Sequence, residues 1–231
     1  MTIGIPRRRF LAGLAGISGF NMLVPVRAAD QDRFSRPTAS GFDFPLVDCH
    51  VHLDNSTIDK VLELPQAREV RFGIVEHAGT KENKYPVVLS NDDELGRFLS
   101  MLDAKPVFRG VQAEWTDWMG CFSRNAVAKL DFVLSDTMTF PDQNGQRVKL
   151  WEDNALDRVG LTHPQEFMDR YVDWHVQILE QEPLDILANT SWLPAPLAKD
   201  YDSLWTPSRI QKVVDAAVRN KVALEISSSY R

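Results

Sequence analysis

Short apolar segments alternate with helix-like segments along most of this chain, and this alternation restricts the possible folds more than any other feature. Nearly continuous apolar runs bounded by turns are typical of strands that are buried on both faces of a parallel sheet. The expected strands cover residues 45–52, 70–75, 107–113, 132–134, 186–188 and 222–226. The expected helices cover residues 56–64, 91–102, 164–181 and 206–220. The chain is therefore expected to have an α/β fold.

Six strand units favour a closed βα barrel over an open sheet. The sequence ends at Arg231, five residues after the sixth expected strand. A barrel that stops there leaves two strand edges unpaired. We therefore expect a distorted, TIM-like barrel that lacks its last strand in this chain, with the natural protein continuing beyond Arg231.

The charge of the chain is unevenly distributed, and this excludes some partners. Residues 1–28 contain four arginines and no acidic residue, so 22 basic and 32 acidic residues are left for the remainder. A body this acidic lacks the basic surface that binds nucleic acid or an anionic membrane. The two cysteines, Cys49 and Cys121, are too few for a disulfide framework.

The N-terminus has the three-part layout of a secretory signal. Arginines come first, an apolar stretch follows over residues 10–24, and small residues surround a cleavage site after Ala28. The apolar stretch is shorter than the roughly 20 residues that a bilayer span needs. The run from Arg7 to Leu11 resembles the twin-arginine export motif.

Three regions follow from this pattern. Residues 1–28 are expected to be a twin-arginine signal peptide, residues 29–43 a linker, and residues 44–231 the functional domain. The mature protein is then expected in the periplasm or outside the cell, without stable membrane insertion.

Polar side chains follow the expected strands, at the end where parallel βα folds place their chemistry. His50 and His52 are two residues apart in the first strand, so both are expected on one face. The other candidates are Glu76 and His77 after the second strand, Glu114 and Trp115 after the third, Asp136 after the fourth, Asn189 after the fifth and Glu225 in the sixth. Imidazoles and carboxylates at one rim suit Zn²⁺, Mn²⁺ or Fe²⁺.

The remaining two histidines are interpreted differently. His163 precedes the long helix at residues 164–181, and His175 lies within it. Neither follows a strand, so we expect surface or hydrogen-bonded core positions for both.

Several segments resemble motifs of the PHP (polymerase and histidinol phosphatase) family of metal-dependent phosphoesterases. Residues 48–52, Asp-Cys-His-Val-His, resemble the first motif; residues 72–77 resemble the second; and residues 111–114 resemble the third. The resemblance extends with weaker motifs to residue 228. It implies a distorted (β/α)₇ barrel, up to three divalent metals and hydrolysis of phosphate esters.

The resemblance also implies roles for individual residues. His50, His52, His77 and Glu114 match metal ligands, with Glu114 in a bridging position. Asp136 would be a ligand or a catalytic base, and Asp48 or Glu76 would orient a histidine. The implied substrate is a small molecule, and Trp115 would lie on the rim that receives it.

The chain departs from the family pattern at other positions. Thr57 and Ile58 stand where the family often has Asp or His, Asp136 and Asn189 stand where it has His, and its final Asp-x-His pair would lie beyond Arg231. We therefore expect one or two metal ions.

Two further interpretations remain. An amidohydrolase-type barrel also begins with His-x-His, but it requires Lys or Glu on the fourth strand and histidines after the next two, where this chain has Asp136, Asn189 and Glu225. The other interpretation is a degenerate barrel that binds a ligand or partner without catalysis, which the lost ligands favour.

Overall fold

A computed structural model describes residues 46–54, 56–64, 70–160 and 163–225. The expected signal peptide and linker lie outside these residues. Within the part that is described, no helix combines the length and the apolar character needed to cross a membrane.

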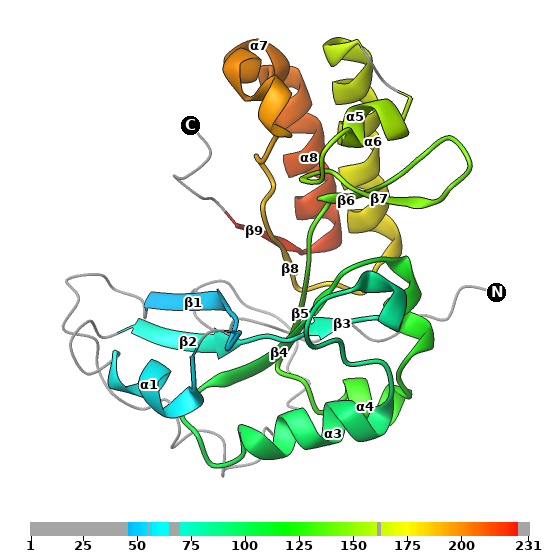
Figure 1. The fold of residues 1–231 in the computed structure, drawn as a ribbon. Coiled ribbons are helices and arrows are strands. Elements are labelled where there is room, and N and C mark those ends of the chain that lie inside the picture. Colours follow the sequence, from blue (N-terminus) through cyan, green and yellow to red (C-terminus); the bar gives the residue numbers. More distant parts are fainter. Residues whose placement is uncertain (1–45, 55, 65–69, 161–162, 226–231) are drawn as a thin grey trace.

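The main sheet is parallel and follows the order of the chain (Figure 1). Its strands run in the order β1 (Leu46–Val51), β2 (Val70–Ile74), β4 (Phe108–Ala113), β5 (Phe132–Ser135), β8 (Ile186–Leu187) and β9 (Ala223–Leu224). The short strand β3 (His77–Ala78) adds to β4 beyond the end of β2. This curled, half-barrel sheet confirms the α/β prediction and is compatible with part of a TIM-like barrel.

The helices lie in two groups on opposite sides of the main sheet (Figure 1). The first group is α1 (Ile58–Glu63), α3 (Asp92–Met101) and α4 (Arg124–Val127), and the second is α5 (Ala155–Arg158), α6 (Pro164–Gln181), α7 (Tyr201–Leu204) and α8 (Pro207–Asn220). Of these, α5 and α7 lie farthest from the sheet (Figure 1). Asn91 and Thr206 cap α3 and α8 by accepting backbone N–H bonds, as N-cap residues do. Short 3₁₀ helices are η2 (Lys81–Asn83), η3 (Thr116–Gly120) and η4 (Ala195–Asp200).

An antiparallel hairpin interrupts the alternation, and the sequence interpretation missed it. Strands β6 (Thr139–Pro141) and β7 (Arg147–Lys149) pair through Phe140 and Val148. The hairpin lies between β5 and α5. The chain therefore passes from the carboxyl end of β5 through this hairpin before it returns along α6. This insertion brings Lys149 toward the strand ends.

The Phe132 side chain lies on the same face of the sheet as the polar residues at the strand ends. It is fully buried in a small cluster with Val75, Leu134 and Ala188. The neighbouring strands supply glycines at this level: an added Cβ at Gly73 would lie 2.9 Å from the Phe132 ring, and one at Gly110 would lie closer still. Because side chains alternate along a strand, Gly110 shares its face with Gln112, and Phe132 shares its face with Asp136. The glycines make room for the ring directly beneath the site.

Candidate metal centre

A β-bulge in β1 positions the first two histidines. Asp48 pairs with Phe72 and Val51 with Ile74, so β1 uses one residue more than β2 over this stretch. The Asp48 carboxylate accepts the backbone N–H of His50 at 3.1 Å. Bulges redirect side chains and are frequent beside active sites. Asp48 is exposed and serves the backbone here.

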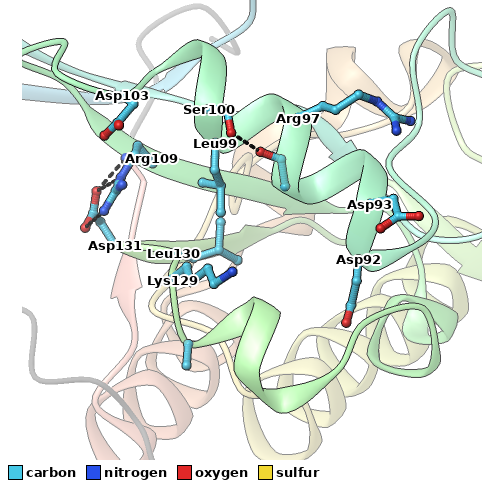
Figure 2. Close-up of a pocket in the computed structure, with 12 residues that line it drawn as sticks. Asp92, Asp93, Arg97, Leu99, Ser100, Asp103, Arg109, Lys129, Leu130 and Asp131 are labelled. Atoms are coloured by element: carbon cyan, nitrogen blue, oxygen red, sulfur yellow. Dashed lines mark hydrogen bonds and ion pairs between the residues drawn. The ribbon is translucent and has the colours of Figure 1, made fainter.

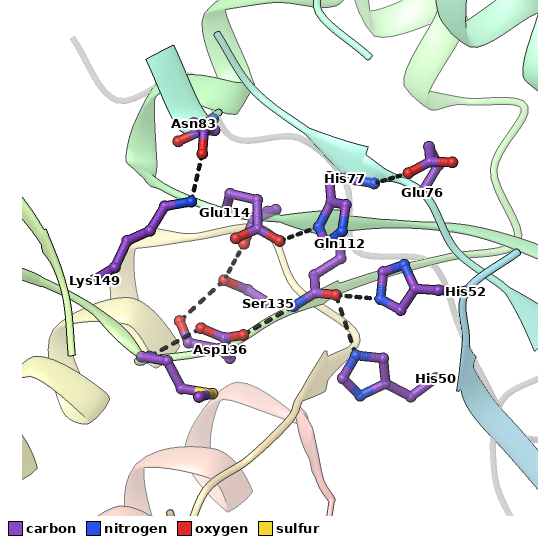
Figure 3. Close-up of polar contacts among 12 residues, drawn as sticks. His50, His52, Glu76, His77, Asn83, Gln112, Glu114, Ser135, Asp136 and Lys149 are labelled. Atoms are coloured by element: carbon purple, nitrogen blue, oxygen red, sulfur yellow. Dashed lines mark hydrogen bonds and ion pairs between the residues drawn. The ribbon is translucent and has the colours of Figure 1, made fainter. Parts of the chain in front are cut away.

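Gln112, at the end of β4, joins the histidines to Asp136 (Figure 3). Its Oε1 accepts from His50 Nε2 at 3.1 Å and from His52 Nε2 at 2.7 Å. Its Nε2 donates to Asp136 Oδ2 at 2.9 Å. In this arrangement both histidines carry a proton on Nε2. Nδ1 of His52 is left for another role, whereas Nδ1 of His50 lies 3.2 Å from Glu225 Oε1. The structure therefore brings His50 and His52 together, as their spacing predicted.

Four side chains form a group that could hold a metal ion. They are His52, Asp54, Glu76 and His77, which we call the donor group. Each offers one possible ligand atom, and these four atoms all lie within 4.8 Å of one another. Three of them were candidates from the sequence. Two imidazoles and two carboxylates suit Zn²⁺, Mn²⁺ or Fe²⁺.

The free nitrogen atoms of the two histidines suit metal binding. Nδ1 of His52 is buried and has no hydrogen-bond partner among the described residues. A buried polar atom without a partner is rare in folded proteins, and a metal ion would supply one. His77 donates Nδ1–H to Glu114 Oε1 at 2.5 Å, which leaves its Nε2 as the ligand atom. A carboxylate behind a histidine in this way is common at metal sites.

The pKa shift of His52 agrees with this use. Burial lowers the pKa of His52, and electrostatic repulsion by His77 and His50 lowers it further, which favours the neutral ring that a ligand must have. Burial raises the pKa of Glu76, which favours its protonated form, and a bound cation would act in the opposite direction. His50 differs: burial opposes its charged form, but hydrogen bonding and charge from Glu225 outweigh burial and raise its pKa.

Glu114 and Asp136 lie next to the donor group: Glu114 contacts His77, and Asp136 contacts Gln112. Glu114 is buried against His77, and it lies outside the four-residue donor group. Asp136 is also buried; burial first, and then the charge of Glu114, raise its pKa to about 7. Its Oδ1 accepts the Met138 N–H at 2.9 Å.

Glu225 connects the two ends of the sheet. Its Oε1 lies 3.2 Å from Nδ1 of His50 in β1, and its Oε2 accepts the backbone N–H of Asn189 at 3.0 Å. Asn189 follows β8 with a φ of 54°, a left-handed conformation that Asn tolerates better than most residues. The described interactions of Asn189 with Glu225 are made by its backbone.

Trp115, His175 and His163 lie outside the donor group. Trp115 packs against Trp174 of α6, with ring centroids 5.4 Å apart, and Arg147 lies over its ring. His175 is fully buried, contacts Thr137 Oγ1 and the Tyr171 carbonyl, and has a pKa that burial lowers to about 4. His163 is exposed at the start of α6. Both histidines lie where they were expected.

Sequence interpretation missed Asp54, Gln112, Tyr85 and Lys149. Alternation along the chain could have indicated the first two, because Asp54 is two residues after His52 and Gln112 is two residues before Glu114. Tyr85 stacks on His77, with ring centroids 3.8 Å apart, and Lys149 Nζ lies 3.8 Å from the Tyr85 centroid. No local pattern marks either of these, because distant loops bring them together.

A surface pocket lies at the amino ends of the strands, opposite the donor group (Figure 2). It has a volume of about 1040 Å³ between α3 and α4 and is lined by residues that include Lys129 and the ion pair Arg109–Asp131. Arg109 lies at the start of β4, whereas Gln112 lies near its end. Because parallel βα folds carry their chemistry at the carboxyl ends of strands, we assign no site here.

Comparison with known proteins gives no family for this chain. No protein-family model matches it, and no curated protein sequence matches it.

Proposed function

We propose that this protein is an exported hydrolase that uses a divalent metal ion held by the donor group. The observation that carries the proposal is the buried Nδ1 of His52, which has no hydrogen-bond partner among the described residues and belongs to a group with a second histidine and two carboxylates. The PHP-like motifs point to phosphate esters as substrates. One group of four donors favours one ion.

The surrounding residues would each have a separate task. A divalent metal supplies an activated water and polarises the bond that is cut. Glu114 holds the His77 ring through Nδ1–H and keeps its Nε2 directed away from the carboxylate. Gln112 does the same for His52 through Nε2–H. Asp136, whose pKa lies at about 7, exchanges a proton near neutral pH, and such a pKa suits a general acid or base.

Metal binding tests this proposal directly. Titration calorimetry with Mn²⁺ and Zn²⁺ is expected to show one site in the wild type and none in His52→Ala. His163→Ala, which changes an exposed histidine, is the matched control and should bind as the wild type does. Glu114→Gln should weaken binding by about 10–100-fold, because it acts behind a ligand. Wild-type affinity in His52→Ala would contradict the assignment.

A second candidate function is metal or ligand binding without turnover. It is favoured by Gln112, a neutral amide that occupies the centre of the His50, His52 and Asp136 network. Hydrolysis of p-nitrophenyl phosphate by the metal-loaded protein separates the two. Metal binding with no metal-dependent hydrolysis of this or other phosphate monoesters would favour the second function.

A further inference from the structure

An apolar groove opens beside the donor group. It has a volume of about 1010 Å³ and lies between the segment after β1, the loop that follows η2, and α3. Its apolar lining includes Leu53, Ile58, Pro86, Val87, Phe98 and Met101. Binding pockets for small molecules are mostly apolar, with a few polar groups placed at one point. This groove has that composition.

The groove and the donor group share residues. Asp54 and Glu76 belong to the donor group and also line the groove, and Tyr85, which stacks on His77, lines it too. A molecule that lies in the groove would therefore have one end against the donor carboxylates. The groove leads to the candidate centre, unlike the surface pocket between α3 and α4.

Two large apolar side chains are exposed within the groove. Val87 is 47% exposed and Met101 is 46% exposed. Lys81 and Glu94 of the lining form an ion pair, with Lys81 Nζ 2.8 Å from Glu94 Oε2, and Arg97 adds a positive charge. Covering apolar surface of this kind removes it from water and is favourable.

We propose that the groove binds the apolar part of the substrate, so that the protein acts on esters of an aryl or extended alkyl alcohol rather than of a small polar one. This inference rests on the proposed function, since it places the bond to be cut at the donor group. The groove, at about 1010 Å³, is as large as pockets that hold drug-sized ligands, so it has room for an aryl or extended alkyl group.

Two non-hydrolysable probes test the inference by calorimetry on Mn²⁺-loaded protein. Phenylphosphonate and methylphosphonate carry the same anionic group and differ in apolar size. The wild type should bind phenylphosphonate about tenfold or more tightly than methylphosphonate. The double variant Val87→Thr, Met101→Gln should reduce this ratio to less than about threefold and leave the affinity for methylphosphonate unchanged.

A matched control uses the same substitutions outside the groove. Val218 and Met119 are also exposed, and Val218→Thr with Met119→Gln should keep the wild-type ratio. Equal affinities of the wild type for the two probes would overturn the inference and leave the metal assignment intact. Equal loss of both probes in the groove variant would also overturn it. A wild type that binds neither Mn²⁺ nor Zn²⁺ would instead refute the proposed function itself.

Discussion

The side-chain amide of Gln112 makes three hydrogen bonds to other side chains in the site, to His50, His52 and Asp136. Gln112 is 5% exposed, so water does not replace these bonds easily. A buried amide with its oxygen toward two imidazole N–H groups and its nitrogen toward a carboxylate has one favourable orientation. The amide thereby selects the histidine nitrogen that is left free.

Replacing Gln112 by Leu is expected to destabilise the fold. The change leaves two partly buried imidazole N–H groups and a buried carboxylate oxygen without partners, and a buried group that loses its partner costs about 1–3 kcal/mol. Urea unfolding should show a loss of at least about 2 kcal/mol. Gln177→Leu, at an exposed position of α6, is the control and should change stability little. Similar stability of both variants would show that the network contributes nothing.

The raised pKa of Asp136 predicts a pH dependence of stability. Its pKa is 3.8 in a model peptide and about 7 in the folded protein, so the folded state retains the proton that the unfolded state loses first. Stability from this group is present below about pH 4 and is lost as pH rises to about 7. Asp136→Asn should therefore become more stable than the wild type as pH rises through this range, by about 2 kcal/mol or more at pH 8.

Urea unfolding of chelator-treated protein between pH 4 and pH 8 measures this difference. Asp202→Asn, at an exposed position of α7, controls for the change in net charge. A constant stability difference between Asp136→Asn and the wild type across the range would contradict the shifted pKa.

Sequence could predict the site at residue level only where backbone periodicity determines the result. His50 and His52 are two apart, and they do meet at one point. The same rule applied to Asp54 would have added the fourth donor. Tyr85 and Lys149 could not be predicted, because they lie on a loop and a hairpin whose positions depend on tertiary packing.

At the scale of elements, one aromatic ring and two glycines set the spacing of three strands. Gly73 in β2 and Gly110 in β4 both lack the side chain that would meet Phe132 of β5. Strand sequences normally avoid Gly, except where another group approaches the backbone closely. The Phe132 ring is that group, and the strand ends that carry Gln112 and Asp136 lie directly above it.

Gly110→Ala should therefore destabilise the protein by about 1–3 kcal/mol through overpacking. Phe132→Leu in the Gly110→Ala background should recover part of the loss, since the two positions share one space. Gly96→Ala, in α3 with nothing near its added Cβ, should be neutral or stabilising by about 0.5–1 kcal/mol. Thermal unfolding of these three variants and of Phe132→Leu alone tests this, and additive effects at Gly110 and Phe132 would refute the shared space.

Elements were predictable where their signals are local. The long helix at residues 164–181 is observed with the expected bounds, because Pro164 starts it and its apolar spacing is regular. The hairpin β6–β7 was missed, although Asn144-Gly145 is a strong hairpin-turn pair. Gly145 has a φ of 75° and donates its N–H to Asp142. The strands on either side have three residues each, which is too short to show a clear alternation of apolar and polar residues.

At the scale of the whole molecule, the expected signal peptide predicts where the protein is found. Replacing Arg7 and Arg8 with Lys should block twin-arginine export, because a receptor reads this pair as an address. Cell fractionation should then show uncleaved precursor in the cytoplasm. Arg27→Lys makes the same change outside the motif and should leave export intact. Mature double variant in the periplasm would refute the twin-arginine assignment.

The strand order of the sheet has a consequence for the timing of folding. Each main strand pairs with the next one along the chain, so the sheet can grow in the order of synthesis. The donor group spans only residues 52–77, and it can assemble once β1, β2 and β4 have paired, because β3, which carries His77, pairs with β4. The contact between His50 and Glu225 joins residues 175 apart, and contacts of long sequence separation form late. A nascent chain would thus acquire its metal donors early, while the proton environment of His50 is completed only when β9 docks.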